Sequence, residues 1–342
     1  MKIIITGGAG FIGCNAAAYF CKRGYQIVLI DNLSRRGSRW NLDRLKSMWN
    51  PRFEHVDICD VPALDACLAA HKDAGGVLHL AAQTAVTTSV ESPRHDFNVN
   101  LLGTFNVLEA MRRHIPHAKL VSACTNKVYG SLDAVPIAEE PSRYSFSILK
   151  NGIDETCPVD FHSPYGCSKG AAEQYVRDYG RIYGLRTVSL RQSCIYGECQ
   201  FGVEDQGWVA WFIIAALLGR PISIFGNGKQ TRDLLFVDDL VRLYELCFTS
   251  DKLPTGFIAN VGGGYHNSLS LLELLAFLKS RGLQITHQFA NTRPGDQPLF
   301  ISNNALLAET LGWHPEIDTQ TGIGRLIKWA SNNIAAIRQV LG

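Results

Sequence analysis

The stretch KIIITGGAGFIG, residues 2–13, decides the fold because an Ile-rich apolar run leads into a glycine-rich turn and then a helical pattern. The consecutive apolar residues Ile3, Ile4 and Ile5 are typical of a strand buried on both faces of a parallel sheet. The turn TGGAGFIG, residues 6–13, stands between this predicted strand and a helix predicted over 13–23. A dinucleotide-binding fingerprint has this position between strand and helix.

The glycines suit a bound pyrophosphate. Gly7, Gly8 and Gly10 let the backbone turn sharply and approach the ligand, while the helix behind them offers free N–H groups and its positive dipole end. Gly13 lets that helix pack close to the sheet. The turn therefore predicts a dinucleotide cofactor.

Asp31 indicates which dinucleotide is bound. It lies 18 residues after Gly13, just past a second apolar run over 26–30. A carboxylate there accepts hydrogen bonds from the adenosine ribose and repels the extra phosphate of NADP. Arg35 and Arg36 follow closely and weaken that preference, but we predict NAD. Asp57-Ile58 is expected near the adenine, and Ala81-Ala82-Gln83 near the nicotinamide-side ribose.

The rest of the first half alternates strands and helices. Further apolar runs cover 76–80, 119–122 and 187–190, with helical stretches over 99–114 and after Tyr165 to about Tyr183. This alternation predicts an α/β fold, a Rossmann-type doubly wound parallel sheet with a smaller mixed α/β C-terminal substrate domain. We expect the NAD-binding domain over 1–190 plus roughly 230–262, and a nucleotide-sugar-binding domain over 191–229 and 263–342.

A candidate catalytic pair follows the sheet. Tyr165 and Lys169 lie four apart on one face of a helix. A neighbouring ammonium and an oxidised nicotinamide favour the phenolate and lower the pKa of the tyrosine, so it can act as a general base. Thr125, just past the run over 119–122, can hydrogen-bond the reacting oxygen.

Composition narrows the class of protein. The 342-residue chain has a formal net charge of +2, which does not indicate a nucleic-acid or membrane-surface binder. The longest apolar stretch, 208–218, is too short to span a bilayer and is expected to form a buried helix. The first strand begins at Lys2, so we expect no signal peptide. The ten scattered cysteines include no CxxC pair. We expect reduced thiols in the cytoplasm and no metal site.

Taken together, these motifs resemble the extended short-chain dehydrogenase/reductase family. The segments GNGKQTRD (226–233) and RPGD (293–296) are similar to its nucleotide-sugar branch. The resemblance implies that Arg232 and Arg293 bind the diphosphate of the sugar nucleotide. TNKVYG (125–130), DFHSPYGCSKGAA (160–172) and DQGWVAWF (205–212) resemble the family members that invert carbon 2 of CDP-linked hexoses, including the long insert between Gly130 and Tyr165.

The resemblance implies an NAD-dependent epimerase that acts on CDP-paratose and CDP-tyvelose, or on CDP-glucose and CDP-mannose. The reaction would be a transient oxidation to a keto sugar followed by hydride return. A nucleotide-sugar 4-epimerase of the UDP-glucose/galactose type is the alternative, because it uses the same chemical groups at carbon 4. Asn126-Lys127 stand where a 4,6-dehydratase needs an acid–base pair, which argues against elimination. A noncatalytic NAD sensor is disfavoured by intact Thr125, Tyr165 and Lys169.

The predicted site residues form three groups. The catalytic residues are Thr125, Tyr165 and Lys169. The expected cofactor contacts are Gly7, Gly10, Phe11, Ile12, Gly13, Asp31, Asn32, Ser34, Arg35, Asp57, Ile58, Leu80, Ala81, Ala82, Gln83, Asn100, Tyr165 and Lys169. The expected substrate contacts are Thr84, Val86, Thr125, His162, Gln206, Arg232 and Arg293. We expect a nucleotide-sugar partner, no nucleic acid or membrane, and a homodimer or homotetramer.

Overall fold

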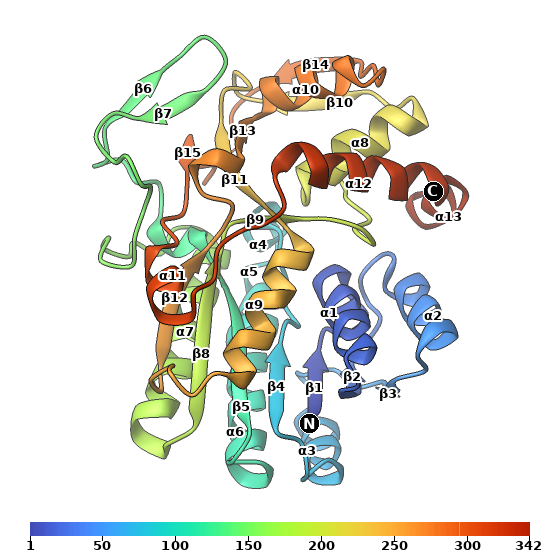
Figure 1. Ribbon diagram of the computed structural model, residues 1–342, viewed down its shortest axis with the longest axis vertical. Helices are drawn as coiled ribbons and strands as arrows, with labels where there is room; N and C mark the ends of the chain where they lie inside the picture. Colours follow the sequence, from blue (N-terminus) through green and yellow to red (C-terminus); the bar gives the residue numbers. More distant parts are fainter. Residues whose placement is uncertain (294) are drawn as a thin grey trace. The chain divides into compact units, whose positions relative to one another are not determined.

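The computed structural model describes residues 1–293 and 295–342 (Figure 1). Chain contacts divide it into two compact units. Unit 1 comprises Met1–Val128, Ser163–Arg191 and Val241–Ala259, and unit 2 comprises Tyr129–His162, Gln192–Leu240 and Asn260–Gly342.

Unit 1 is built on a seven-stranded sheet in the order β12-β8-β5-β4-β1-β2-β3. The strands are β1 (Lys2–Thr6), β2 (Gln26–Ile30), β3 (Arg52–Glu54), β4 (Gly76–His79), β5 (Lys119–Thr125), β8 (Arg186–Gln192) and β12 (Phe257–Val261). The pairs β1–β2, β1–β4, β2–β3 and β4–β5 are parallel, and Thr6 pairs with both Ile30 and His79. The strand order reverses between β1 and β4, so the predicted Rossmann-type sheet is confirmed.

Helices cover both faces of this sheet. On one face, Ile4, Val77 and Leu120 pack in a continuous core with α3 (Val61–Ala70), α6 (Gly103–His114) and α7 (Ser163–Tyr183). On the other face, α1 (Phe11–Lys22) contacts α9 (Val237–Thr249) through the ring pair of Phe20 and Phe248. The remaining helices of unit 1 are α2 (Ser38–Met48), α4 (Val86–Glu91), α5 (Pro93–Asp96) and the π-helical turn η1 (Phe97–Leu102).

Unit 2 mixes short strands with helices. The strand β11 (Thr231–Phe236) pairs parallel with β9 (Cys194–Tyr196) and β15 (Leu299–Phe300) and antiparallel with β13 (Ser268–Ser270). β10 (Ile222–Phe225) pairs with β14 (His287–Ala290), and β6 (Ile137–Glu139) pairs with β7 (Tyr144–Phe146). Its helices are α8 (Trp208–Leu218), α10 (Leu271–Ser280), α11 (Ala305–Leu311), α12 (Thr319–Asn332) and α13 (Ile334–Leu341). The expected mixed α/β character is confirmed.

Several element bounds differ from the sequence-based expectation. β5 continues to Thr125, because the buried run extends past Ser122, so Thr125 ends the strand. The helix expected over 99–114 starts with the π-helical turn Phe97–Leu102. Residues 129–162 and 230–240 group with unit 2. The assignment of cofactor binding to one unit and sugar-nucleotide binding to the other stays a prediction.

In the part of the chain that the structure describes, no helix combines the length and apolar character needed to cross a membrane. All ten cysteines are free thiols, and five of them are buried.

Candidate active site

The glycine-rich turn adopts a shape that larger residues cannot take. Gly7 has a φ of +68° and an added Cβ there would lie 2.8 Å from the Ala81 nitrogen. At Gly13 an added Cβ would lie 2.8 Å from the Gly8 Cα and closer still to the Gly7 oxygen. Among residues 1–293 and 295–342, no side chain caps the N-terminus of α1, and no acidic residue lies in its first turn. The positive end of α1 is therefore available to an anion, and the turn fits a pyrophosphate.

The loop after β2 carries Asp31 beside this turn. Its carboxylate accepts hydrogen bonds from the backbone nitrogens of Ala9 (3.0 Å) and Leu33 (2.7 Å). Burial raises the pKa of Asp31, and these backbone hydrogen bonds oppose the rise. The carboxylate is thus fixed at the carboxyl end of β2, the position that the sequence predicted for a ribose contact.

The neighbouring predicted cofactor residues form a polar loop. Asn32 donates to Asp57 (2.8 Å), and Ser34 donates to Asn32 through both its nitrogen (3.0 Å) and its hydroxyl (2.7 Å). Asn32, Ser34 and Arg35 are exposed. Ile58 differs from its neighbours, because its side chain is 4% exposed and belongs to the core. A contact from Ile58 to a cofactor is therefore restricted to its backbone.

The segment after β4 brings the predicted nicotinamide-side residues to the same sheet edge. Leu80, Ala81 and Ala82 are partly exposed, whereas Gln83 is 5% exposed. The hydroxyl of Thr84 is buried and, within residues 1–293 and 295–342, has no hydrogen-bond partner. The same holds for the hydroxyl of Thr87, which sequence reasoning missed. A buried hydroxyl without a partner is costly, so these two groups are candidates for ligand contacts.

The structure brings the three predicted catalytic residues together. The hydroxyl of Thr125, at the end of β5, acts on the buried phenol of Tyr165 and lowers its pKa. One helical turn along α7, the Lys169 ammonium donates to the Ala123 carbonyl of β5 (2.7 Å). All three side chains are buried. The register of β5 against α7 therefore assembles an acid–base cluster from distant parts of the sequence.

Electrostatics at this cluster are set mainly by burial. Burial raises the pKa of Tyr165, while the hydrogen bond with Thr125 and the positive charge of Arg35 oppose the rise. Burial lowers the pKa of Lys169. The buried thiol of Cys124 lies beside this cluster, and its sulfur is 3.7 Å from the Lys169 carbonyl oxygen. Burial therefore keeps Tyr165 as the neutral phenol, and added positive charge would favour the phenolate that can accept a proton.

Asn100 takes a different position from the other predicted cofactor residues. It is fully buried in η1. Its side-chain oxygen accepts from the Gln83 nitrogen (2.9 Å), and its amide nitrogen donates to Asp96 (3.0 Å) and Ser168 (3.2 Å). Asn100 is therefore a buried residue that holds Gln83 and Ser168 in place through hydrogen bonds. Asp96 and Ser168, which sequence reasoning missed, belong to the same buried network.

A second buried pair lies on the face of α7 that carries Lys169. Glu173, four residues after Lys169, accepts two hydrogen bonds from the Arg191 guanidinium of β8 (2.7 and 2.9 Å). Side-chain exposure is 0% for Glu173 and 6% for Arg191. The spacing of four after Lys169 was the available sequence signal for Glu173.

Unit 2 contains the two arginines predicted to bind a diphosphate. Arg232 donates to Asp296 (3.0 Å), and Arg293 pairs with Asp205 (3.0 Å) and stacks over the Phe225 ring at 3.5 Å. Their partners Asp296 and Asp205 are both exposed residues. Both guanidinium groups are thus held in place before any ligand binds.

The other predicted substrate residues are less constrained. His162 is exposed. Gln206 closes a tight turn with Val203 through reciprocal backbone hydrogen bonds of 3.0 Å. Val86 begins α4 and is partly exposed. Their roles as substrate contacts stay predictions.

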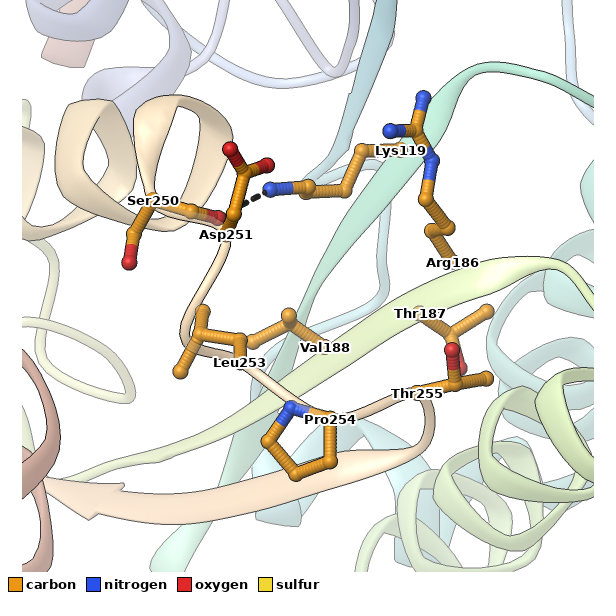
Figure 2. A pocket seen from close by; sticks show the side chains of 9 residues that line it. All are labelled: Lys119, Arg186, Thr187, Val188, Ser250, Asp251, Leu253, Pro254 and Thr255. Atoms are coloured by element: carbon orange, nitrogen blue, oxygen red, sulfur yellow. Dashed lines mark hydrogen bonds between the residues drawn. The ribbon is translucent and has the colours of Figure 1, made fainter.

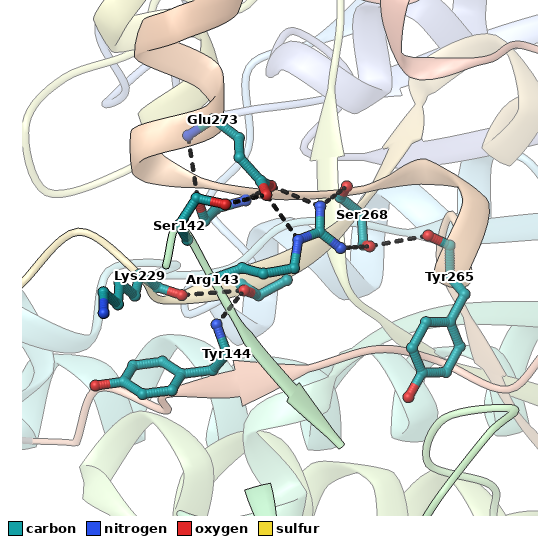
Figure 3. Close-up of polar contacts among 9 residues, drawn as sticks. Ser142, Arg143, Tyr144, Lys229, Tyr265, Ser268 and Glu273 are labelled. Carbon is teal, nitrogen blue, oxygen red and sulfur yellow. Dashed lines mark hydrogen bonds and ion pairs between the residues drawn. The ribbon is translucent and has the colours of Figure 1, made fainter. Parts of the chain in front are cut away.

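The long insert belongs to unit 2 and contains the hairpin β6–β7, whose residues Arg143 and Tyr144 make polar contacts with other segments of the unit (Figure 3). The Arg143 guanidinium donates to Glu273 (2.5 and 2.8 Å) and to the Ser268 hydroxyl (3.1 Å). The Tyr144 nitrogen donates to the Lys229 carbonyl (3.0 Å), and the Lys229 ammonium donates to Glu139 (2.7 Å). The hairpin therefore holds the loop that leads into Arg232.

A small pocket elsewhere in unit 1 does not resemble a catalytic site (Figure 2). It lies where β5 and β8 begin, at the sheet edge opposite the glycine turn. The Lys119 ammonium there donates to three carbonyls, those of Cys247 (2.9 Å), Phe248 (3.2 Å) and Ser250 (2.7 Å). These bonds cap the carbonyl groups at the C-terminal end of α9, which indicates a structural role for Lys119.

Comparisons with known proteins agree with this geometry. Residues 4–326 match the protein family described as GDP-mannose 4,6 dehydratase. The CDP-paratose 2-epimerase of Salmonella typhi is 40% identical over 97% of this chain and 100% of its own length. A putative UDP-glucose 4-epimerase of Methanocaldococcus jannaschii is 34% identical over 97% of this chain and 99% of its own length.

A solved structure shares the fold. The UDP-glucose 4-epimerase of Thermus thermophilus, crystallised in complex with NAD, superposes with a TM-score of 0.82. It is 33% identical, and the match covers 96% of this chain and 98% of that one.

Proposed function

This chain belongs to the GDP-mannose 4,6-dehydratase family within the extended short-chain dehydrogenases/reductases, and we propose that it is an NAD-dependent epimerase that inverts carbon 2 of a CDP-linked hexose. The observation that carries the proposal is the Thr125–Tyr165–Lys169 cluster at the carboxyl edge of a Rossmann sheet. The full-length identity of 40% to a CDP-paratose 2-epimerase supports the choice of carbon 2.

The residues of unit 1 fit NAD. Gly7 and Gly13 let the turn pack tightly against the Ala81 backbone and the start of α1, which leaves the N-terminus of α1 to face a pyrophosphate, and Asp31 is held where a ribose would lie. When bound, NAD would supply reversible hydride transfer at its nicotinamide ring. That chemistry suits the substrate, because the hydrogen on carbon 2 of a hexose has no neighbouring carbonyl to acidify it. Transient oxidation to a keto sugar removes the need to deprotonate carbon.

The chain itself manages one proton. Tyr165 would accept the proton of the sugar hydroxyl and later return it to the same oxygen. Thr125 would orient that oxygen and stabilise the phenolate through the hydrogen bond that it makes with Tyr165. Lys169 would stabilise the phenolate electrostatically and hold a cofactor ribose. Because proton and hydride both return, no net oxidation results.

The diphosphate would bind to Arg232 and Arg293, whose planar guanidinium groups suit phosphate oxygens. His162 and Gln206 are the proposed substrate contacts that choose the carbon atom, and Thr84 offers an unused hydroxyl. Tests for a preference among nucleotides should compare CDP-hexoses with UDP-hexoses.

The 4-epimerase remains the second candidate, because the 34% and 33% identical relatives are named 4-epimerases. Elimination chemistry is disfavoured, because Asn126 and Lys127 follow Thr125 where a dehydratase needs an acid–base pair.

We further propose that the protein works as a homodimer or homotetramer in the cytoplasm. Free thiols support a reducing location. Large apolar side chains on η1 and α7 are exposed and suit burial against a second copy; they are Phe97, Leu102, Tyr175, Ile182 and Tyr183.

The proposed function is tested by NMR of the products formed from a panel of CDP- and UDP-hexoses, together with analysis of the dinucleotide bound to the purified protein. We expect bound NAD, a 2-epimer from a CDP-hexose and no steady accumulation of NADH. Steady NADH accumulation would indicate a net dehydrogenase and contradict the proposal.

A further inference from the structure

A buried histidine ends the strand that leads into the predicted nicotinamide-side loop. His79, the last residue of β4, is 2% exposed and is the register partner of Thr6, the last residue of β1. Its Nδ1 lies 2.7 Å from the Thr6 hydroxyl oxygen, and its Nε2 lies 3.0 Å from the hydroxyl oxygen of Thr104 in α6. Both ring nitrogens are therefore hydrogen-bonded, and the proposed reaction uses neither of them.

The hydroxyl of Thr104 decides which ring nitrogen carries the proton. Its oxygen lies 2.6 Å from the backbone carbonyl oxygen of Asn100 in η1. A carbonyl oxygen has no hydrogen to give, so Thr104 donates to Asn100. Because a hydroxyl has a single hydrogen, Thr104 can only accept from His79. Nε2 is therefore the protonated nitrogen of the ring.

The other ring nitrogen sets the direction of the Thr6 hydroxyl. Burial, followed by the positive charge of Lys169, lowers the pKa of His79 to about 3, so the imidazole is neutral and Nδ1 carries no hydrogen. Nδ1 then accepts the hydroxyl hydrogen of Thr6. The lone pairs of the same hydroxyl accept hydrogen bonds from the backbone nitrogens of Leu80 (3.2 Å) and Ala81 (3.3 Å).

These bonds hold a loop that has no regular secondary structure. Residues 80–85 form neither helix nor strand. At the start of this loop two backbone nitrogens donate to the Thr6 hydroxyl, and further along the Gln83 nitrogen donates to the Asn100 side chain (2.9 Å). His79 therefore connects the two residues that fix the loop, directly to Thr6 and through one hydroxyl to Asn100.

We propose that His79 is a positioning residue, fixed as the neutral tautomer with its proton on Nε2, and that it orients the hydroxyls of Thr6 and Thr104 so that the loop over 80–83 keeps one shape. The consequence for cofactor binding rests on the proposed function, in which this loop contacts the nicotinamide-side ribose. Without an acceptor at Nδ1, the hydroxyl of Thr6 is no longer held with its lone pairs toward the loop nitrogens. NAD would then bind more weakly.

The first experiment determines the tautomer and needs neither cofactor nor substrate. Histidine labelled at its ring nitrogens is incorporated into the whole chain, and the ring signals are recorded by NMR between about pH 6 and pH 9. The signal that disappears in His79→Asn identifies His79. We expect a protonated Nε2 and a bare Nδ1 throughout. A proton on Nδ1, a mixture of tautomers or a ring that becomes charged in this range overturns the proposal.

The second experiment measures the affinity for NAD in two variants that each keep one side of the ring. His79→Asn places an amide oxygen near Nδ1 and keeps the acceptor for Thr6, so its affinity should stay within about threefold of the parent. His79→Gln places an amide nitrogen near Nε2 and loses that acceptor, so its affinity should fall by about tenfold. The exposed His117→Gln is the control for the substitution itself. Equal losses in the two His79 variants would mean that the ring only fills space and would overturn the proposal.

A double-variant cycle keeps the test independent of any one variant. Thr6→Val removes the hydroxyl through which His79 acts, so it should weaken NAD binding as much as His79→Gln does. In the Thr6→Val background, His79→Gln should have no further effect, and additive losses overturn the proposal. If His79→Gln does not fold, Thr6→Val decides alone, and parental affinity in that variant overturns the proposal. A parent chain without affinity for NAD would contradict the proposed function, and the tautomer measurement would then decide the inference about His79.

Discussion

The hydroxyl of Thr125 provides a quantitative test of the proposed proton transfer. Thr125→Val keeps the shape of the side chain at the end of β5 and removes the hydroxyl that lowers the pKa of Tyr165 and would hydrogen-bond its phenolate. A hydrogen bond to a charged group contributes about 1.5–3 kcal/mol. Since about 1.4 kcal/mol corresponds to a tenfold change in rate, kcat should fall about 10- to 150-fold.

The pH dependence gives the same test a direction. The bond from Thr125 lowers the pKa of Tyr165, so its removal raises that pKa and moves the acidic limb of the kcat profile to higher pH. Thr125→Ser keeps the hydroxyl and should remain within a few fold of the parent. The assay is epimerisation of a CDP-hexose followed by NMR across the pH range. An unchanged rate and acidic limb in Thr125→Val would refute the assigned role of Thr125.

Three further variants test the other parts of the site. Tyr165→Phe should reduce turnover by about 10²- to 10⁴-fold while the bound cofactor is retained, and near-normal turnover would mean that another residue is the base. Gly13→Ala should yield folded protein that has lost its NAD, because the new Cβ would lie 2.8 Å from the Gly8 Cα. Gly324→Ala is the matched control, because no atom lies within 4 Å of the Cβ added there. Full NAD content in Gly13→Ala would contradict the proposed pyrophosphate position. Arg232→Met should weaken equilibrium binding of CDP, while the exposed Arg338→Met should not, and equal affinities would remove Arg232 from the diphosphate site.

The sequence was sufficient to predict the sheet, because local signals carry that information. The run Ile3–Ile5, the glycine turn and the spacing to Asp31 follow from the needs of a parallel sheet and a bound dinucleotide. Tyr165 and Lys169 were also accessible, because their spacing of four places them on one helical face.

Other features depend on contacts between distant segments, which no local pattern reveals. The buried network of Asp96, Asn100 and Ser168 requires η1 to meet α7, and Asp96 alone resembles an ordinary polar residue before a helix. Ile58 follows a strand as a ligand contact would, yet its side chain packs in the core. The docking of Arg143 on Glu273 likewise depends on where the insert folds back.

The site of hydride transfer is the most direct test of the central claim. CDP-paratose is prepared with deuterium at carbon 2 in one sample and at carbon 4 in another, and turnover of each is compared with the unlabelled compound. We predict a primary kinetic isotope effect only from carbon 2, with a tyvelo-configured product. An isotope effect only from carbon 4, with a galacto-configured product, would contradict the account in favour of a 4-epimerase.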